Sequence, residues 1–301
     1  MQQGSGKCVA VVVTYNKLDY LKECLNRLQK CRQFLQKIVV VNNASTDGTR
    51  DYLMELSTAE SLIDVLNEKE NLGGAAGFNA GIKKAMEFDA DAIWVMDDDC
   101  QVEPSTVDEL QCAASSLVAD GVEWGVLASN VRWTDGGPAV MNIPKTVATW
   151  NDRAETNLIR IEHSSFVSMY INTSMVKKFG YPIKDFFIWG DDVEYSYRIA
   201  SKYPSYCVMS SEVVHNMVAN AKVDIMTDSA NRVPRYFYDV RNNFFISKRI
   251  GKKETLRFVY GFLKKIIRVS FHGQARAKKV RVLLRGFLAG LVFNPTVEKF
   301  Q

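Results

Sequence analysis

Short runs of apolar, mostly β-branched residues, each followed by a helix-like pattern, are the feature of this sequence that most constrains its fold. The runs CVAVVVTY, IVVVN and AIWVM carry no charged side chain, which is typical of strands buried on both faces. After the first run, leucines recur at the three- and four-residue spacing of one apolar helix face. Strands alternating with helices favour a parallel sheet. The sequence therefore predicts an α/β fold, Rossmann-like, with a mostly parallel sheet flanked by helices.

The same patterns predict the order of the elements along the chain. We expect strands at 8–15, 38–42, 62–66, 92–96, 125–131, 165–171 and 206–214. We expect helices at 18–28, 49–56 and 105–117, a further helix that the segment 71–81 leads into and that runs through Met86, and a long surface loop at 134–157. These patterns divide the chain into a first half at 1–100, a second half at 101–231 and a helical extension at 232–301.

Charge separates the extension from the rest of the chain. Residues 1–231 hold 21 Lys and Arg against 31 Asp and Glu, whereas 232–301 hold 17 against 3. Two apolar stripes at helical spacing, within 256–267 and 280–291, have Lys and Arg beside them. Such stripes suit an anionic membrane surface, so we expect peripheral membrane contact through 250–293. The alternative is a helical hairpin that packs its stripes on the body or on another subunit.

Cysteine usage and apolar run length bear on the cellular location. The six cysteines show no CxxC spacing, and residues 1–8 lack the apolar region of a signal peptide. No stretch reaches the ~20 apolar residues that a spanning helix needs. We therefore expect reduced cysteines and a cytoplasmic protein at the inner face of the cytoplasmic membrane.

Three consecutive carboxylates, Asp97, Asp98 and Asp99, directly follow the fourth predicted strand. Neighbouring carboxylates repel one another and resist burial, so folding alone does not explain them. On an extended segment alternate side chains share a face, which lets Asp97 and Asp99 reach one site while Asp98 turns aside. Two such carboxylates suit Mg²⁺ or Mn²⁺. The alternative is a solvated acidic turn that caps the next helix.

Three further segments carry residues that could take part in chemistry. The glycine-rich NLGGAAGFNAG at 71–81 opens a helix, whose first N–H groups favour anions, although a plain tight turn is the alternative. In WGDDVEYSYR, Asp191 and Asp192 could accept protons, or could simply be acids favoured at a helix N-terminus. His215 follows a strand and could reach the same sheet edge, although a lone histidine is more often structural.

In this order, the segments TYN, VVNNASTDGT, NLGGAAGFNAG, DDD, WGDDVEYSYR and EVVHNM resemble the inverting GT-A glycosyltransferases of family 2. They are most similar to a subgroup of bacterial galactofuranosyl- and rhamnosyltransferases that build polysaccharide and cell-wall chains. The resemblance covers roughly 7–250 and includes the Tyr-rich RYFYDVRNNFF at 235–245. It implies that 1–100 binds the nucleotide sugar and that 101–231 binds the acceptor and carries the catalytic base.

The resemblance also implies a role for each matched position. Asp97, Asp99 and His215 would hold Mn²⁺ or Mg²⁺ against the donor diphosphate. Asp192 would be the general base, and Asp191, at the first position of the same acidic motif, would be the catalytic residue beside it. The donor contacts would come from Thr14, Tyr15, Asn16, Asn43, Asn71, Gly73, Gly74, Asn79, Asp97, Asp98 and Trp189. Two positions depart from the family pattern: Asn42 stands where Asp is usual, and Ala76 adds a methyl group to the glycine-rich loop.

The expected reaction is therefore inverting transfer of a sugar from a UDP- or dTDP-linked donor, with galactofuranose ahead of rhamnose. The acceptor would be a glycan or a polyprenyl-diphosphate-linked glycan, and a homo-oligomer is possible. One rival is a sugar-1-phosphate nucleotidyltransferase, but TYNKLDYL lacks the glycines expected after the first strand. Another is a nucleic-acid-binding protein using the basic extension, which leaves the DDD and WGDD segments unexplained, so no nucleic-acid partner is expected.

Overall fold

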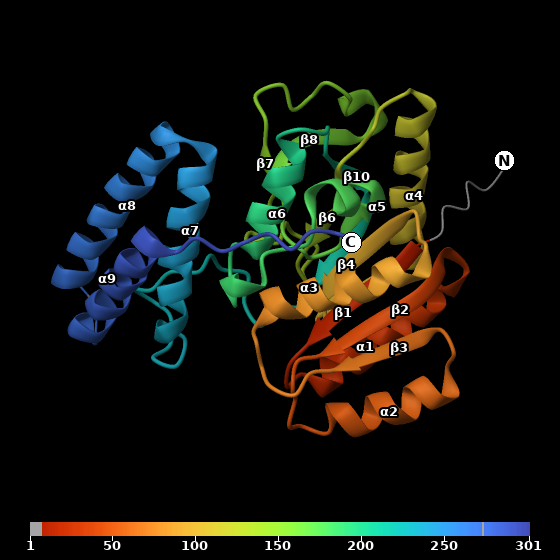
Figure 1. Ribbon diagram of the computed structural model, residues 1–301, viewed down its shortest axis with the longest axis horizontal. Coiled ribbons are helices and arrows are strands. Elements are labelled where there is room, and N and C mark those ends of the chain that lie inside the picture. The colour runs from red at the N-terminus through yellow and green to blue at the C-terminus, as the bar shows by residue number, and fades with distance from the viewer. Residues whose placement is uncertain (1–7, 273) are drawn as a thin grey trace.

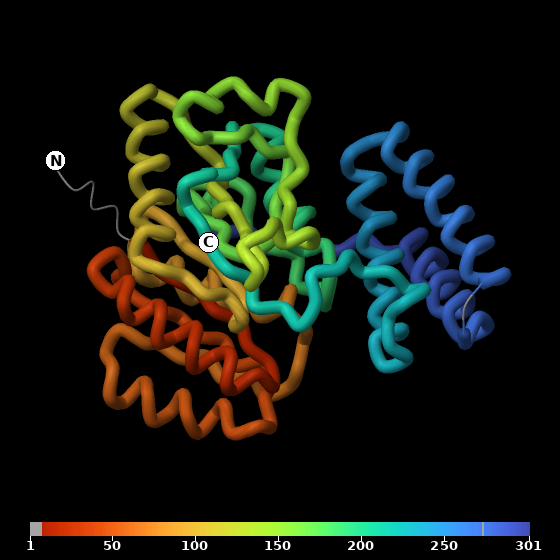
Figure 2. Tube along the Cα trace, turned by 180° about the vertical axis from the view of Figure 1, so that it is seen from behind, coloured from red at the N-terminus to blue at the C-terminus, as the bar shows by residue number. Residues whose placement is uncertain are grey.

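The computed structural model describes residues 8–272 and 274–301 (Figure 1). Residues 1–7, on which the expectation about a signal region rests, lie outside this description. An α/β body and a group of three C-terminal helices lie side by side along the long axis of the molecule (Figures 1 and 2).

The first half of the sheet is parallel, as expected. Strands β1 (Cys8–Thr14), β2 (Leu35–Asn42), β3 (Ile63–Asn67) and β4 (Ala92–Asp97) lie in the order β3-β2-β1-β4. Every residue of β1 is buried, and its side chains alternate between two separate apolar cores. A strand covered on both faces accounts for the uninterrupted apolar run in the sequence.

The second half of the sheet is mixed. Strand β9 (Met169–Asn172) runs antiparallel between β4 and β6 (Val126–Arg132), and β10 (Tyr206–His215) lies parallel to β6. The short β5 (Cys100–Gln101) and β8 (Leu158–His163) pair antiparallel with β10, and β7 (Lys145–Thr146) pairs with β8. The expected parallel arrangement therefore describes the first half of the sheet better than the second.

Helices cover both faces of the sheet. One core contains side chains of α1 (Leu18–Lys30), α2 (Thr49–Ala59) and α4 (Pro104–Ala119). The other contains side chains of α3 (Gly74–Ala85), α5 (Thr173–Phe179) and α6 (Asp191–Ala200). Helix α3 lies so close to β1 that a Cβ on Gly77 would be 2.6 Å from a methyl carbon of Val13.

Two predictions in the region between 134 and 171 differ from the structure. The strand expected at 165–171 begins only at Met169, because Ser168 has a positive φ of 55° that interrupts the extended backbone. Strand β8 lies in a segment for which no strand was expected. The expected long loop at 134–157 is largely irregular, apart from β7 and the 3₁₀ turn η3 (Ala154–Thr156).

The extension forms three helices, α7 (Tyr236–Ile250), α8 (Lys252–Phe271) and α9 (Arg276–Val292), with their own apolar core. Figures 1 and 2 place α7 between the α/β body and the other two helices. Phe245 and Ile246 of α7 join a cluster that also contains Ala75 and Phe186 of the body. Apolar side chains from both sides of the boundary expected at residue 232 therefore pack together, so the extension is in contact with the body. Within the described ranges, every helix is too short or too polar to span a bilayer.

The remaining short elements are 3₁₀ turns. They are η1 (Arg32–Phe34), η2 (Met86–Phe88), η4 (Lys184–Phe186) and η5 (Val233–Arg235). After α9 the chain returns to the body, where the Tyr181 N–H donates to the Glu298 carbonyl at 2.9 Å.

Candidate active site

The predicted site residues meet at one edge of the sheet because neighbouring parallel strands end there together. In the sheet register Thr14 of β1 lies beside Asn42 of β2, and Val13 lies beside Asp97 of β4. The antiparallel pairing of β10 with β5 sets His215 opposite Cys100, directly after the three aspartates. This edge is where ligands bind in open α/β sheets.

Asp97, Asp99 and His215 are brought together as the sequence predicts. One potential ligand atom from each lies within 4.8 Å of the other two. His215 Nε2 is 3.0 Å from Asp99 Oδ1, and both residues are buried. The Asn216 N–H donates to the Asp99 carbonyl at 2.9 Å, which fixes the end of β10 against the aspartates. Two carboxylates and an imidazole are a suitable ligand set for Mn²⁺ or Mg²⁺.

A residue that the sequence did not single out, Asn142, orients His215. The Asn142 side-chain NH₂ donates to Ser165 Oγ at 2.9 Å, so its oxygen faces His215 Nδ1 at 2.8 Å. This contact makes Nδ1 the donor and directs Nε2 toward Asp99. Among the described residues, no donor other than His215 approaches Asp99 Oδ1. The nitrogen and the oxygen therefore share either a proton or a cation, so the donor set fits a divalent metal.

The third carboxylate, Asp98, turns aside as expected. Its Oδ2 accepts a hydrogen bond from Thr14 Oγ1 at 2.8 Å, and its Oδ1 lies 3.3 Å from Lys17 Nζ. Lys17, which the sequence reasoning did not select, also lies 2.7 Å from Asp99 Oδ2. One lysine thus partly balances two of the three charges.

The pKa values of the aspartates reflect this uneven balance. Burial, and secondarily the charge of Asp99, raise the pKa of Asp97 to about 6. Burial raises the pKa of Asp98 to about 7, against the opposing effect of Lys17. For Asp99 burial acts in the same direction, but His215 and Lys17 outweigh it and lower its pKa to about 2. Burial of three neighbouring carboxylates is therefore only partly offset by Lys17 and His215, and a cation at Asp97 and Asp99 would stabilise their ionised forms.

Asp191 and Asp192 begin helix α6, after the N-cap residue Gly190. Burial raises the pKa of Asp192 to about 6 and that of Asp191 well above its ordinary value. The charge of Asp192 also contributes to the raised pKa of Asp97, so the two carboxyl groups lie within electrostatic reach. A carboxylate with a pKa near 6 is ionised at neutral pH and is a stronger base than a solvated aspartate.

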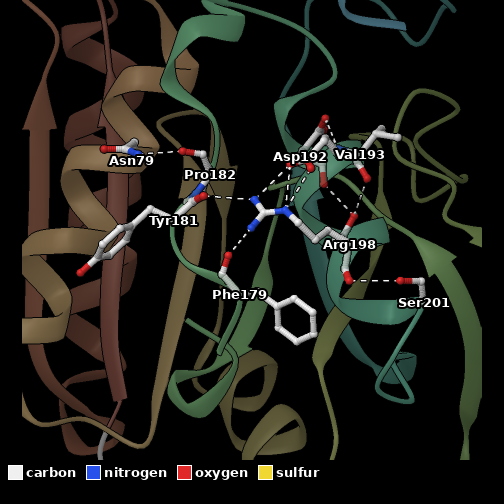
Figure 3. A network of polar contacts seen from close by, with 10 residues as sticks. Asn79, Phe179, Tyr181, Pro182, Asp192, Val193, Arg198 and Ser201 are labelled. Carbon is white, nitrogen blue, oxygen red and sulfur yellow. Dashed lines mark hydrogen bonds and ion pairs between the residues drawn. The ribbon is translucent and has the colours of Figure 1, made fainter. Parts of the chain in front are cut away.

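Helix α6 is anchored by Arg198 (Figure 3). Its guanidinium donates to Glu194 Oε1 at 3.0 Å, to the Phe179 carbonyl at 2.5 Å and to the Tyr181 carbonyl at 3.1 Å. On the neighbouring α3, Asn79 Nδ2 donates to the Pro182 carbonyl at 2.7 Å. The segment around Tyr181 thus ties α6 to α3, and the Asn79 side-chain N–H is already used within the fold.

The residues expected to contact the nucleotide line the rest of the edge. Asn43 Nδ2 donates to Asn71 Oδ1 at 3.0 Å, which joins the loop after β2 to the glycine-rich loop. Tyr15 and Asn16 are exposed, and Asn16 has a positive φ of 52°. Asn42, at the family's usual Asp position, donates to Asn67 Oδ1 at 2.8 Å, a bond that a carboxylate could not make.

The first two glycines of the glycine-rich loop, Gly73 and Gly74, have different surroundings. A Cβ on Gly73, which has a positive φ of 85°, would collide with the backbone carbonyl of Phe187. Nothing lies within 4 Å of the position that a Cβ on Gly74 would take. Gly73 is therefore required by a contact within the protein, whereas Gly74 faces open space that a ligand can enter. Trp189 is half-buried and packs edge-on against Tyr236, with ring centroids 5.4 Å apart.

Sequence comparison finds relatives of this chain among glycosyltransferases. The family model described as Glycosyl transferase family 2 matches residues 9–173, more than half of the chain. Glycosyltransferase AglE of Haloferax volcanii is 24% identical over 192 residues, which cover 62% of this chain and 59% of AglE. Galactofuranosyltransferase GlfT1 of Mycobacterium tuberculosis is 27% identical over 277 residues, which cover 84% of this chain and 88% of GlfT1.

Among solved structures, the crystal structure of GalNAc-T7 with UDP, GalNAc and Mn²⁺ is similar at a TM-score of 0.60 and 15% identity. The match covers 91% of this chain and 59% of that chain. At this identity the likeness speaks for the fold alone, and it confirms the expected GT-A architecture. The chain spans 59% of the length of both AglE and the GalNAc-T7 chain.

Proposed function

The chain belongs to glycosyl transferase family 2, and on that premise we propose that it transfers a sugar from a nucleoside-diphosphate donor to a glycan or lipid-linked glycan. The observation that carries the proposal is the meeting of Asp97, Asp99 and His215 at one sheet edge, within electrostatic reach of Asp192. Galactofuranose from UDP is the favoured sugar because the chain is similar to a galactofuranosyltransferase over 84% of its length. Rhamnose from a dTDP donor is second, and surface polysaccharide synthesis is the proposed setting.

The proposed reaction is a single displacement at the anomeric carbon. Asp192 accepts the proton of an acceptor hydroxyl while that oxygen forms the new bond to the anomeric carbon. The bond from this carbon to the diphosphate oxygen breaks on the opposite face, the electron pair leaves with the nucleoside diphosphate, and the configuration inverts. Asp97, Asp99 and His215 would hold Mn²⁺ or Mg²⁺, which supplies positive charge for the departing diphosphate.

The donor would lie along the open part of the edge. We assign its contacts to exposed or half-buried residues there: Tyr15, Asn16, Asn71, Gly74 and Trp189, with the buried Thr14, Asn43 and Asp98 beneath them. A screen of nucleotide sugars with and without EDTA tests the proposal, read by thermal stabilisation and slow donor hydrolysis. Metal-dependent stabilisation by one nucleotide sugar supports it, and a folded protein that responds to none of a full panel contradicts it.

Asn142→Ala is expected to weaken Mn²⁺ binding by roughly 10- to 100-fold, the usual effect of removing a partner that orients a ligating histidine. Without the Asn142 oxygen, His215 Nδ1 loses its acceptor at 2.8 Å and the ring is free to turn. Free Mn²⁺ measured by electron paramagnetic resonance gives the affinity without any assay of activity. Asn26→Ala, at an exposed position of α1, is the matched control, and equal Mn²⁺ affinity in both variants would refute the role of Asn142.

The surface of α8 supports the proposed membrane contact. Leu256, Tyr260, Leu263, Ile267 and Phe271 recur at four- and three-residue spacing and are between 54% and 72% exposed. Arg257, Lys264 and Arg268 are exposed on the same helix, and Leu284 and Leu288 are exposed on α9. Other residues of the two predicted stripes, among them Ile266, Leu283 and Phe287, pack in the core that α7, α8 and α9 share. The side chains named above stay exposed, and Figure 1 places α8 and α9 beyond α7 as seen from the body. An apolar face beside basic side chains suits a surface of anionic lipid.

Replacing Tyr260, Leu263 and Ile267 together by serine is expected to reduce sedimentation with phosphatidylglycerol vesicles at least about tenfold, since three apolar side chains lose their burial in lipid. Val118→Ser is the control, because Val118 is 65% exposed on α4 of the body. Unchanged sedimentation of the triple variant would remove the membrane assignment. A change in oligomeric state together with unchanged vesicle binding would assign the stripe to a second copy of the chain.

A further inference from the structure

The turn that leads into the proposed catalytic base has an uncommon backbone. Phe187 and Trp189 both have a φ of 65°, and Gly190 has a φ of 90°. Bulky residues rarely adopt this left-handed region, and they remain there only where the surroundings hold them. Asp191 and Asp192 follow at once as the first residues of α6. Whatever holds this turn therefore also sets where α6 begins.

The side chain of Asn242, from the C-terminal extension, bonds to most of this turn. Asn242 of α7 is fully buried, and its Nδ2 lies 3.0 Å from the Phe186 carbonyl, 3.1 Å from that of Ile188 and 2.8 Å from that of Trp189. Its Oδ1 accepts a hydrogen bond from Arg241 Nε at 2.9 Å. One NH₂ group, with two hydrogens, thus lies within hydrogen-bond distance of three carbonyls of this turn.

Arg241 holds the beginning of the same turn. Its Nη2 donates to the Asp185 carbonyl at 2.7 Å and to the Phe186 carbonyl at 3.1 Å. Its guanidinium also lies 3.9 Å from the centre of the Phe293 ring, so the side chain is fixed on both sides. Arg241 and Asn242 together replace the regular hydrogen bonds that an irregular turn lacks.

The turn touches the proposed donor site as well as the proposed base. The Phe187 carbonyl accepts a hydrogen bond from the Ala75 N–H at 3.2 Å, in the first turn of α3. The same carbonyl lies where a side chain on Gly73 would be, so the glycine-rich loop and the turn are in direct contact. A displacement of the turn would therefore change the position of Asp192 relative to the glycine-rich loop.

We propose that Asn242 is a positioning residue that holds the turn at 186–190, and through it the proposed base Asp192, against the glycine-rich loop. The catalytic part of this inference rests on the proposed function. It assigns a role to the segment 235–245, which was noted in the sequence only because it resembles a segment of the family. It also explains why the basic extension begins with a helix packed on the α/β body rather than with a separate domain.

The chain provides a matched control in the next residue. Asn243 Nδ2 donates to the Asp239 carbonyl at 2.9 Å and to Asp239 Oδ1 at 2.8 Å, both within α7. Asn242→Ala and Asn243→Ala thus remove the same side chain from adjacent positions of one helix. Asn242→Asp is the shape-preserving variant, because it keeps the volume and removes the NH₂ donors.

Hydrogen exchange read by mass spectrometry tests the structural part without any assay of activity. In Asn242→Ala and Asn242→Asp, exchange in peptides covering 184–194 is expected to rise at least tenfold, while peptides from β1 and α4 keep the wild-type rates. Asn243→Ala is expected to match the wild type throughout. Exchange that rises equally over the whole chain, or that does not rise at 184–194, would overturn the role of Asn242.

Kinetics tests the catalytic part with the donor and metal found by the screen. Asn242→Asp is expected to lower kcat roughly 100-fold, since a displacement of about 1 Å has that effect on a positioned group, and to change the donor KM less than threefold. Wild-type kcat together with faster exchange at 184–194 would overturn the positioning role. Faster exchange in a protein that transfers no sugar at all would instead refute the proposed function and leave the structural role of Asn242 standing.

If the Asn242 variants do not fold, Arg241→Ala provides the test. Arg241 is half-buried, and its loss removes the bonds to the Asp185 and Phe186 carbonyls and the contacts with Asn242 Oδ1 and the Phe293 ring, while the Asn242 NH₂ group keeps its three carbonyls. A local rise in exchange at 184–194 of about threefold, with kcat reduced in the same variant, is the expected result. Unchanged exchange there would overturn the inference.

Discussion

Asp99→Ala is expected to reduce sugar transfer roughly a thousandfold, the scale of several kcal/mol that a bound metal contributes to a developing charge. Asp99 has two roles at the site. Its Oδ1 lies 3.0 Å from His215 Nε2, and its Oδ2 lies 2.7 Å from Lys17 Nζ. Alanine would remove a proposed metal ligand and one of the two carboxylates that contact Lys17, and we expect the remaining carboxylates not to restore the geometry.

The measurement is product formation as a function of Mn²⁺ concentration. The variant is expected to need far more Mn²⁺ and to stay below the wild-type maximum at saturation. Asp108→Ala, which removes an exposed carboxylate from α4, controls for the loss of negative charge. Near wild-type turnover in Asp99→Ala would rule out the metal site.

Asp192→Asn is expected to lower turnover by roughly 10²- to 10⁴-fold and to leave the donor dissociation constant within about threefold of the wild type. The amide keeps the size of the side chain and can no longer accept the acceptor's proton. The metal-ligand candidates lie on β4, after it and at the end of β10, so donor binding is expected to survive. Donor affinity from calorimetry and turnover from product formation separate the two effects. Loss of donor binding would show that the base is misassigned.

The pH dependence of turnover is a second test of the role of Asp192, with the same variant. Burial raises the pKa of Asp192 to about 6, and a base works only in its ionised form, so wild-type turnover is expected to fall as the pH drops through about 6. At saturating Mn²⁺, which would keep Asp97 ionised, the residual turnover of Asp192→Asn is expected not to fall as the pH drops through about 6. Asp185→Asn, at an exposed position of the preceding turn η4, is expected to keep the fall of the wild type.

The meeting of the metal-ligand candidates was predictable from the sequence because it follows from the architecture. Uninterrupted apolar runs predicted buried parallel strands, and such strands end together at one edge. Asp97 and Asp99 follow the end of one predicted strand, and His215 follows another predicted strand, so the architecture allowed all three to reach one edge despite the 116 residues between His215 and Asp99. The family resemblance then selected His215 as the third ligand.

The residues that orient this site were not predictable in the same way. Asn142 lies in an irregular stretch without periodicity, and its contact with His215 spans 73 residues, so only the folded chain brings them together. Asn242 lies on a helix of the extension, 50 residues after the Asp192 that we propose it positions. The position of Lys17 could have been predicted. Lys17 is the first basic residue after β1, and β1 pairs with β4, the strand that the aspartates follow.

The glycine-rich loop shows how one motif can have two causes. The sequence suggested close approach of a ligand at Gly73, Gly74 and Gly77. The structure gives Gly73 and Gly77 contacts within the protein that exclude any side chain, and leaves open space at Gly74. Composition alone cannot separate these causes, because both require a residue without Cβ.

The most direct test of the central claim is the affinity of UDP for the wild-type protein by calorimetry, in Mn²⁺ and in EDTA. If Asp97, Asp99 and His215 hold a cation against the donor diphosphate, UDP is expected to bind at least about tenfold more tightly in Mn²⁺, and Asp99→Ala is expected to remove the difference. Equal UDP affinity in Mn²⁺ and EDTA would contradict the metal-assisted account of this site.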